Sequence, residues 1–263
     1  MVDRQASLKE AFDRHSLDYD ASFSLLNSAQ TMRCEVWRLA EQLFPPGSRL
    51  LDLGCGTGED AVHFARNGNH VTAIDIAPAM IEQLRTKARV AQVSQCVDAR
   101  VASIESFDPE PAAFDGIFSN FGAVNCIRSL PTLRRIAARG LKPGKPLLLV
   151  TMGRFYPLET LVFLLKGNLR RAFVRLSREP VVDVAGIAVS FAYYSPPQLR
   201  RALGADFSLE QLRGLRSLVP SPSLEHVGRL LPLHLMKALD GFVTRFRPTA
   251  SFGDHYVSVW RYQ

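Results

Sequence analysis

The stretch LLDLGCGTGED, residues 50–60, restricts the fold of this 263-residue chain more than any other feature. An apolar run typical of a buried strand leads directly into glycines at positions 54, 56 and 58. Glycine loses more backbone entropy on folding than any other residue, so three on alternate positions indicate a turn that something approaches closely. Such a turn between a first strand and its helix is typical of open α/β sheets that bind nucleotides.

The segments around this turn alternate between short apolar runs and helical patterns, which indicates a parallel α/β sheet. Strands are expected over 49–53, 70–75, 98–103, 114–120, 146–152, 207–219 and 254–262, and a hairpin over 181–194. Helical patterns cover much of 1–45, 59–67, 79–91, 130–139, 158–176 and 224–246. The fold class is therefore α/β with a doubly wound, three-layer sheet.

Charge and cysteine content narrow the class of protein further. The net charge is +7, with the excess in two clusters, 128–145 and 166–178, that contain no acid. Few aromatic residues lie among these charges, so we interpret the clusters as solvated helix faces rather than a nucleic-acid surface. No secretory leader or membrane-spanning run is seen, and the four scattered cysteines show no metal spacing. We expect a cytoplasmic protein with reduced thiols and no metal.

The spacing of the glycines and the acids after them indicates the chemistry of the ligand. GxGxG differs from the dinucleotide pattern GxGxxG, and Asp75 ends the next strand, where a carboxylate can accept hydrogen bonds from both ribose hydroxyls. Glu59 and Asp60 begin the following helix, and their charges would repel a pyrophosphate. The pattern favours a ligand that has a ribose and a positive charge but no phosphate.

LLDLGCGTGED, together with VTAIDIAPAMI at 71–81, resembles the first two motifs of the class I S-adenosylmethionine-dependent methyltransferases, of the quinone-biosynthesis or small-molecule type. The resemblance covers about 49–152 and implies a Rossmann-like sheet of seven strands with the last antiparallel. It also implies S-adenosyl-L-methionine as cofactor, released as S-adenosyl-L-homocysteine. The cofactor-binding residues that it implies are Tyr19, Asp52, Gly54, Cys55, Gly56, Gly58, Asp75, Ile76, Met80, Ser103, Ile104, Asn120 and Phe121.

In this resemblance the glycine turn lies under the methionine part of the cofactor and Asp52 lies near its ammonium group. Asp75 holds the ribose, and Ser103 is expected beside the adenine, with Asp98 as the rival. Tyr19 belongs to LDYDASF, which resembles a segment that folds over the cofactor.

The acceptor side of the site is less defined, because methyl transfer needs a base only when the nucleophile carries a proton. Tyr19, Tyr194 and His255 are the candidates for such a base, and Asn125 is a further catalytic candidate. The candidates for substrate binding are Asn125, Arg154 and Tyr194. A turn or cap role for Asn125 and a structural role for His255 remain open.

We expect one domain over 1–263, with a helical N-terminal extension over 1–45 and an inserted substrate lid over 154–201. The expected activity is methyl transfer to O, N or C of a small, partly apolar metabolite. Three alternatives remain: an RNA or protein methyltransferase, a non-catalytic cofactor-binding module, and a nicotinamide dehydrogenase. The basic, amphipathic insertion also suggests transient docking on a membrane. The oligomeric state stays open.

Overall fold

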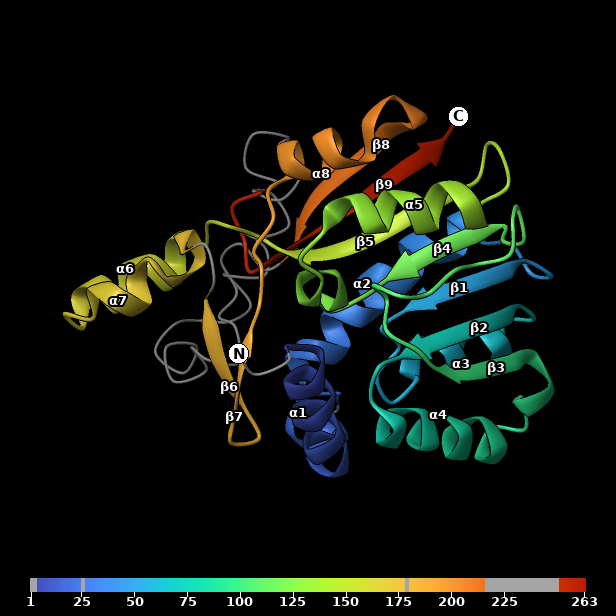
Figure 1. Ribbon diagram of the computed structural model, residues 1–263, viewed down its shortest axis with the longest axis horizontal. Helices are drawn as coiled ribbons and strands as arrows, with labels where there is room; N and C mark the ends of the chain where they lie inside the picture. Colours follow the sequence, from blue (N-terminus) through green and yellow to red (C-terminus); the bar gives the residue numbers. More distant parts are fainter. Residues whose placement is uncertain (1–3, 25–26, 178–179, 216–250) are drawn as a thin grey trace.

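The computed structural model describes residues 4–24, 27–177, 180–215 and 251–263, and within them a seven-stranded sheet forms the middle layer (Figure 1). The strand order is β3-β2-β1-β4-β5-β9-β8. The first five strands are parallel, and β9 runs antiparallel to both β5 and β8. Their bounds are β1 Arg49–Leu53, β2 His70–Asp75, β3 Val97–Val101, β4 Gly116–Ser119, β5 Pro146–Met152, β8 Phe207–Leu215 and β9 His255–Tyr262. The predicted fold class is confirmed; the helical pattern over 224–246 lies outside the described residues.

The sheet is buried on both faces because alternate side chains of its strands are apolar on both sides. In β1, Leu50 packs into one core, and Leu51 and Leu53 pack into the other. The first core is covered by three helices, α2 Asn27–Leu43, α3 Glu59–Arg66 and α4 Pro78–Val90. The second core is covered by α5 Leu130–Gly140 and α8 Pro196–Leu203.

The predicted N-terminal helices are present, and they lie where the parallel strands end. Helix α1, Arg4–Tyr19, continues through a π-helical turn, Asp20–Ser24, toward α2. Figure 1 shows α1 between α4 and the hairpin formed by β6, Val181–Val184, and β7, Ile187–Ser190. Its Asp13 Oδ1 accepts a hydrogen bond from the Ala79 amide (3.0 Å), and Arg4 donates to the Ser190 carbonyl (3.0 Å). Helix α1 therefore covers the ends of the parallel strands.

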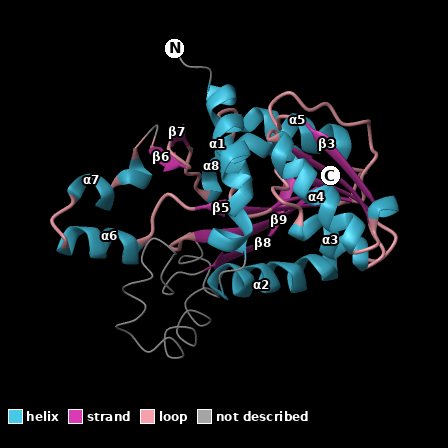
Figure 2. Cartoon of the chain, turned by 90° about the horizontal axis from the view of Figure 1, so that it is seen from below, coloured by secondary structure: helices cyan, strands magenta, loops and turns pink. Residues whose placement is uncertain are grey.

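The segment expected as one inserted lid, 154–201, consists of three separate parts. Helices α6, Pro157–Leu165, and α7, Leu169–Ala172, form a pair that stands apart from the layers in Figures 1 and 2. The β6–β7 hairpin packs against α1. Helix α8 packs Leu199 and Leu203 into the second core, so its residues belong to the helical layer rather than to a lid.

Candidate functional site

A cavity lies at the carboxyl ends of the parallel strands. Sheets of this kind bind ligands there, at the point where the strand order reverses, which is between β1 and β4. The wall of the cavity combines the turns after β1 to β4, the end of β5, and side chains of α1 and α2. All of the cofactor residues predicted from the sequence line it except Asp52 and Gly58: they are Tyr19, Gly54, Cys55, Gly56, Asp75, Ile76, Met80, Ser103, Ile104, Asn120 and Phe121. The structure therefore brings together groups that are spread over a hundred residues of sequence.

The three glycines of the turn have positive φ angles, +76° at Gly54, +53° at Gly56 and +85° at Gly58, but they serve different purposes. A Cβ at Gly54 would lie 2.4 Å from the Ala123 Cβ, and one at Gly58 would lie 2.1 Å from the Leu84 Cδ1. At Gly56 the nearest atom would be 3.8 Å away, on Tyr19. Gly54 and Gly58 are thus required by protein packing, and Gly56 leaves bare backbone toward the cavity.

Asp75 both shapes the glycine turn and faces the cavity. Its Oδ2 accepts a hydrogen bond from the Gly56 amide (3.0 Å) and its Oδ1 accepts one from the Ala77 amide (2.9 Å). Burial raises the pKa of Asp75, and the two backbone amides oppose that shift. Each carboxylate oxygen can accept a further hydrogen bond, so the two hydroxyls of a diol in the cavity could both donate to Asp75.

Asp60 connects α2, α3 and the turn after β4 in the wall of the cavity. Its Oδ1 accepts a hydrogen bond from Trp37 Nε1 (2.6 Å) and lies 3.5 Å from the Arg33 Nε, and its Oδ2 accepts from the Asn120 side-chain amide (3.0 Å). The Arg33 guanidinium lies 4.6 Å from the centre of the Phe121 ring, and both residues line the cavity. The carboxylate that was expected to repel an anion is therefore paired with a buried cation.

Glu59 is paired as well, and its partner ties the N-terminal segment to the glycine turn. Lys87 forms ion pairs with Glu59 and with Asp20 Oδ2 (2.6 Å), and Asp20 Oδ1 accepts a hydrogen bond from the Thr57 hydroxyl (2.7 Å). These contacts hold Tyr19 over the turn. Burial raises the pKa of Tyr19, so its phenol stays protonated.

Arg33 is a site residue that the sequence reading missed. It lies on α2 one and two turns before Trp37 and Ala40, and it is 5% exposed. An arginine that shares a helix face with apolar residues at i+4 and i+7 is expected to be buried with them, and this spacing could have identified Arg33 from the sequence.

Asp52 lies behind the cavity wall rather than on it. Its side chain is 1% exposed, and its Oδ2 has no hydrogen-bond partner in the part of the chain that is described. Burial raises the pKa of Asp52 well above its ordinary value, and the nearby Asp60 and Asp75 raise it further. A buried acceptor without a partner costs about 1–3 kcal/mol, so this atom lowers the stability of the ligand-free protein.

We expect Asp52→Asn to stabilise the ligand-free protein by about 1 kcal/mol at pH 8. The unfolded carboxyl titrates near pH ~3.9 and the folded one higher, so the folded wild type binds more protons between these values and loses stability as pH rises. Asparagine does not titrate, so the difference in stability between the variant and the wild type should vanish near pH ~4. Urea denaturation between pH 4.5 and pH 8 measures this difference, and an unchanged or lower stability at pH 8 would contradict it.

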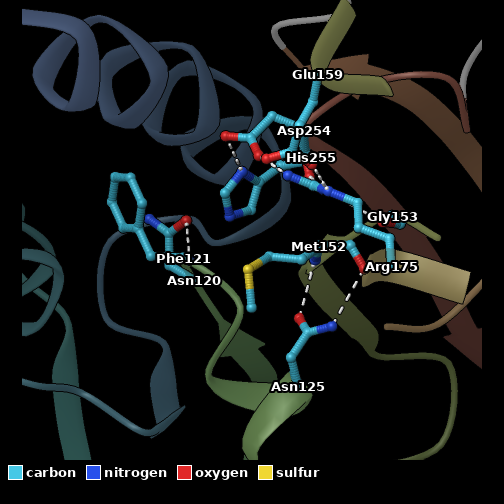
Figure 3. Close-up of polar contacts among 9 residues, drawn as sticks. All are labelled: Asn120, Phe121, Asn125, Met152, Gly153, Glu159, Arg175, Asp254 and His255. Carbon is cyan, nitrogen blue, oxygen red and sulfur yellow. Dashed lines mark hydrogen bonds and ion pairs between the residues drawn. The ribbon is translucent and has the colours of Figure 1, made fainter. Parts of the chain in front are cut away.

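Asn125 does not reach the cavity, because its amide is used by the backbone. Its Oδ1 accepts a hydrogen bond from the Met152 amide (2.9 Å), and its Nδ2 donates to the carbonyls of Met152 (3.1 Å) and Ala192 (2.6 Å). Figure 3 shows the contacts between Asn125 and Met152 at the end of β5. These contacts therefore match a structural role for Asn125 in the turn, the alternative that the sequence left open.

Arg154 and Tyr194 also lie outside the cavity lining. The Tyr194 hydroxyl donates to the Ile127 carbonyl (2.6 Å), and Arg154 donates to the Leu176 carbonyl (3.4 Å). Their substrate-binding roles stay predictions that this geometry does not support.

His255 opens β9, and because β9 is antiparallel, its first residue lies at the same sheet edge as the cavity. The side chain is buried and its Nδ1 lies 3.2 Å from Asp254 Oδ2. Asp254 is paired in turn with Arg175, whose Nη2 lies 2.6 Å from Oδ1 (Figure 3). The antiparallel topology thus places His255 at the ligand edge of the sheet.

Two cysteine thiols, Cys55 and Cys126, line the cavity. Burial raises the pKa of both, that of Cys126 to about 12, so neither is a thiolate at neutral pH. The described residues contain no cluster of three or more metal-ligating side chains. No helix among them is long and apolar enough to cross a bilayer.

Comparison with known proteins agrees with this geometry. Residues 50–144 match the family model described as a methyltransferase domain. The chain is 36% identical over 143 residues to the ubiquinone biosynthesis O-methyltransferase of Xanthomonas axonopodis pv. citri (strain 306). That match covers 52% of this chain and 56% of the relative, so the chain spans little more than half the length of the curated relatives it matches.

Solved structures share the fold at low identity. Geranyl diphosphate C-methyltransferase from Streptomyces coelicolor A3(2), solved with S-adenosyl-L-homocysteine, has a TM-score of 0.57 at 17% identity, covering 88% of this chain and 78% of that one. The [4+2]-cyclase SpnF has a TM-score of 0.61 at 18% identity, covering 97% and 94%. Since a cyclase shares the architecture, the reaction must be argued from the site and not from the fold.

Proposed function

We propose that this chain, which contains a class I S-adenosylmethionine-dependent methyltransferase domain, transfers a methyl group from S-adenosyl-L-methionine to a small, partly apolar acceptor. The observation that carries the proposal is the meeting of three groups on one cavity: the bare backbone of Gly56, the Asp75 carboxylate and the Arg33 guanidinium. The carboxylate suits a ribose diol, the guanidinium suits a carboxylate, and the bare backbone lets a ligand lie close to the turn.

The wall residues fit each part of that molecule. Asp75 would accept hydrogen bonds from the ribose hydroxyls, and Arg33 would pair with the carboxylate. Ile76 and Met80 supply apolar surface for the base. When bound, the cofactor supplies an electrophilic methyl group on a positively charged sulfur.

The rest of the wall supports a small acceptor. It is apolar in large part, with side chains from α1, the turn before α5, the end of β5 and the hairpin: Leu8, Phe12, Ile127, Met152 and Phe191. Such a wall orients a compact molecule and keeps water from the reacting atoms. Because α1 covers this region, a metabolite fits it better than a polymer.

The first test is direct. Isothermal titration calorimetry with S-adenosyl-L-methionine and S-adenosyl-L-homocysteine should detect binding of both, and NADH should give no heat. Methyl-tritiated cofactor with a panel of catechols and hydroxybenzoates should give labelled product. Binding without transfer to any acceptor class would favour the cofactor-binding module instead.

The basic cluster over 128–145 gives little support to an RNA substrate. Its side chains pair with acids from distant segments: Arg134 with Asp206 (2.6 Å), Arg135 and Arg139 with Asp108 (each 3.2 Å), and Lys142 with Asp115 (2.8 Å). Phosphate binding would have to displace these partners. We also propose a cytoplasmic location, in line with the four free cysteines.

The α6–α7 pair is the element that we propose to dock on an anionic membrane. It exposes large apolar side chains and cations together, namely Leu161, Leu164, Leu165, Leu169 and Phe173 with Lys166, Arg170 and Arg171. Its acid, Glu159, is half-buried and paired with Arg175. Apolar side chains beside basic ones, on a part that stands apart from the body (Figure 2), suit the surface of an anionic bilayer.

We expect the protein to sediment with phosphatidylcholine vesicles that contain 30% phosphatidylglycerol, and far less with pure phosphatidylcholine. Replacing Arg170 and Arg171 with serine should weaken binding about 30-fold, at roughly 1 kcal/mol per charge. Leu165→Asp should weaken it as well, whereas Leu17→Asp on α1 should not, although the two leucines are 80% and 82% exposed. Equal losses for the two leucine variants would contradict docking through this pair.

A further inference from the structure

His255 is not among the residues that line the cavity, but it lies next to one that is, Met152 at the end of β5. It pairs with Met152 across the antiparallel β5–β9 ladder, and residues opposed in this way have neighbouring side chains. Met152 lines the cavity, and its side chain packs over Gly122, where an added Cβ would lie 3.1 Å from the Met152 Cγ. In Figure 3 the imidazole points toward the end of β5 and toward the turn that carries Asn120 and Phe121.

The ring has a defined orientation because Asp254 is anchored. Arg175 binds the Asp254 side chain through Nη2 (2.6 Å) and its carbonyl through Nη1 (3.0 Å), and it is held by Glu159 on α6. Burial opposes ionisation of Asp254, but the contacts with the His255 ring and the Arg175 guanidinium outweigh it and hold the pKa of Asp254 well below its ordinary value. The 3.2 Å contact therefore joins Nδ1 to a carboxylate.

This contact determines which ring nitrogen is basic. A carboxylate can only accept, so Nδ1 carries the proton and the neutral ring presents the lone pair of Nε2. Within the described residues Nε2 has no hydrogen-bond partner. Among the described residues, the charged groups joined to the ring by ion pairs are Asp254, Arg175 and Glu159.

The other catalytic candidates lack such an atom. The Tyr194 hydroxyl donates to the Ile127 carbonyl, and burial raises the pKa of Tyr194 to about 12. Both polar atoms of the Asn125 amide are bonded to backbone. The pKa of Tyr19 is raised by burial, so its protonated phenol cannot accept a proton at neutral pH.

We propose that His255, oriented by Asp254, is the proton acceptor for a hydroxyl-bearing acceptor that enters the cavity along Met152. The inference rests on the proposed function. As the methyl–sulfur bond breaks and a methyl–oxygen bond forms, the hydroxyl proton passes to Nε2. The sulfonium becomes a neutral thioether, the imidazole becomes an imidazolium next to the Asp254 carboxylate, and the proton later leaves to solvent. The substrate class is then an apolar phenol or alcohol.

The tautomer can be measured without any acceptor. Long-range ¹H–¹⁵N NMR at pH 8 should show Nδ1–H for the histidine whose signals vanish in His255→Gln, and Asp254→Asn should shift it toward Nε2–H, because an amide can donate. An Nε2–H tautomer in the wild type would overturn the proposal, whether or not an acceptor is known.

Activity gives the second readout, with a catechol as probe. His255→Gln should lower kcat at least 100-fold with little change in KM or in calorimetric affinity for S-adenosyl-L-methionine. A nitrocatechol that is already ionised in the assay should lose far less, because it needs no base. A loss of less than threefold with catechol, or equal losses with both probes, would overturn the role of His255. Failure of the wild type to bind the cofactor would instead overturn the proposed function.

Discussion

Asp75→Ala is expected to weaken binding of S-adenosyl-L-methionine at least 100-fold. Two hydrogen bonds to a charged acceptor are worth about 3 kcal/mol or more, which corresponds to that factor. The variant also loses the acceptors of the Gly56 and Ala77 amides, so the glycine turn itself should loosen. Calorimetry with the cofactor and its homocysteine product measures the loss.

Asp98→Ala is the matched control for this experiment. Asp98 was the sequence-based rival for an acidic cofactor contact, but it lies on the exposed side of β3 and pairs with Arg100 (2.6 Å). Its replacement should leave the affinity unchanged. If Asp75→Ala stayed folded by circular dichroism and bound within threefold of the wild type, the ribose assignment would be wrong.

Gly58→Ala should lower the free energy of unfolding by about 3 kcal/mol. The new Cβ would meet Leu84 at 2.1 Å, and overpacking of this kind costs about 1–3 kcal/mol. The positive φ of +85° adds about 1–2 kcal/mol of backbone strain for a residue with a Cβ. The midpoint of urea denaturation at unchanged m-value measures the change.

Two other glycines separate the contributions. Gly47 has the same φ of +85° and no atom within 4 Å of an added Cβ, so Gly47→Ala should cost only the strain. Gly56→Ala should cost a similar amount and also weaken cofactor binding, because its Cβ would enter the cavity wall. If Gly58→Ala and Gly47→Ala were equally stable, the packing role of Gly58 would be refuted.

The cofactor side of the site was predictable because its residues follow strands directly. Gly54, Asp75, Ser103 and Asn120 come just after or at the ends of successive parallel strands, and those ends meet at one edge of a sheet. A local pattern of strands and turns is then enough to place residues that are far apart in the sequence.

The acceptor side was not predictable in the same way. Arg154 and Tyr194 were chosen for their position in an insertion, but the insertion divides into a hairpin, a projecting helix pair and a layer helix. Their side chains face backbone carbonyls instead of the cavity. Insertions have no fixed register against the sheet, so spacing along the chain does not determine where their side chains point.

The sequence alone determined the sheet, its glycine turn and the acid at the end of β2, because strand periodicity and positive-φ glycines are local requirements. The tertiary structure decided which charged side chains form ion pairs. Asp60 meets Arg33 and Asp254 meets Arg175 from distant helices or turns. It also decided that α1 covers the cavity and that His255 reaches the ligand edge. These outcomes depend on how separate elements pack, and the energy of a charge depends on its neighbours in space rather than on its neighbours in the chain.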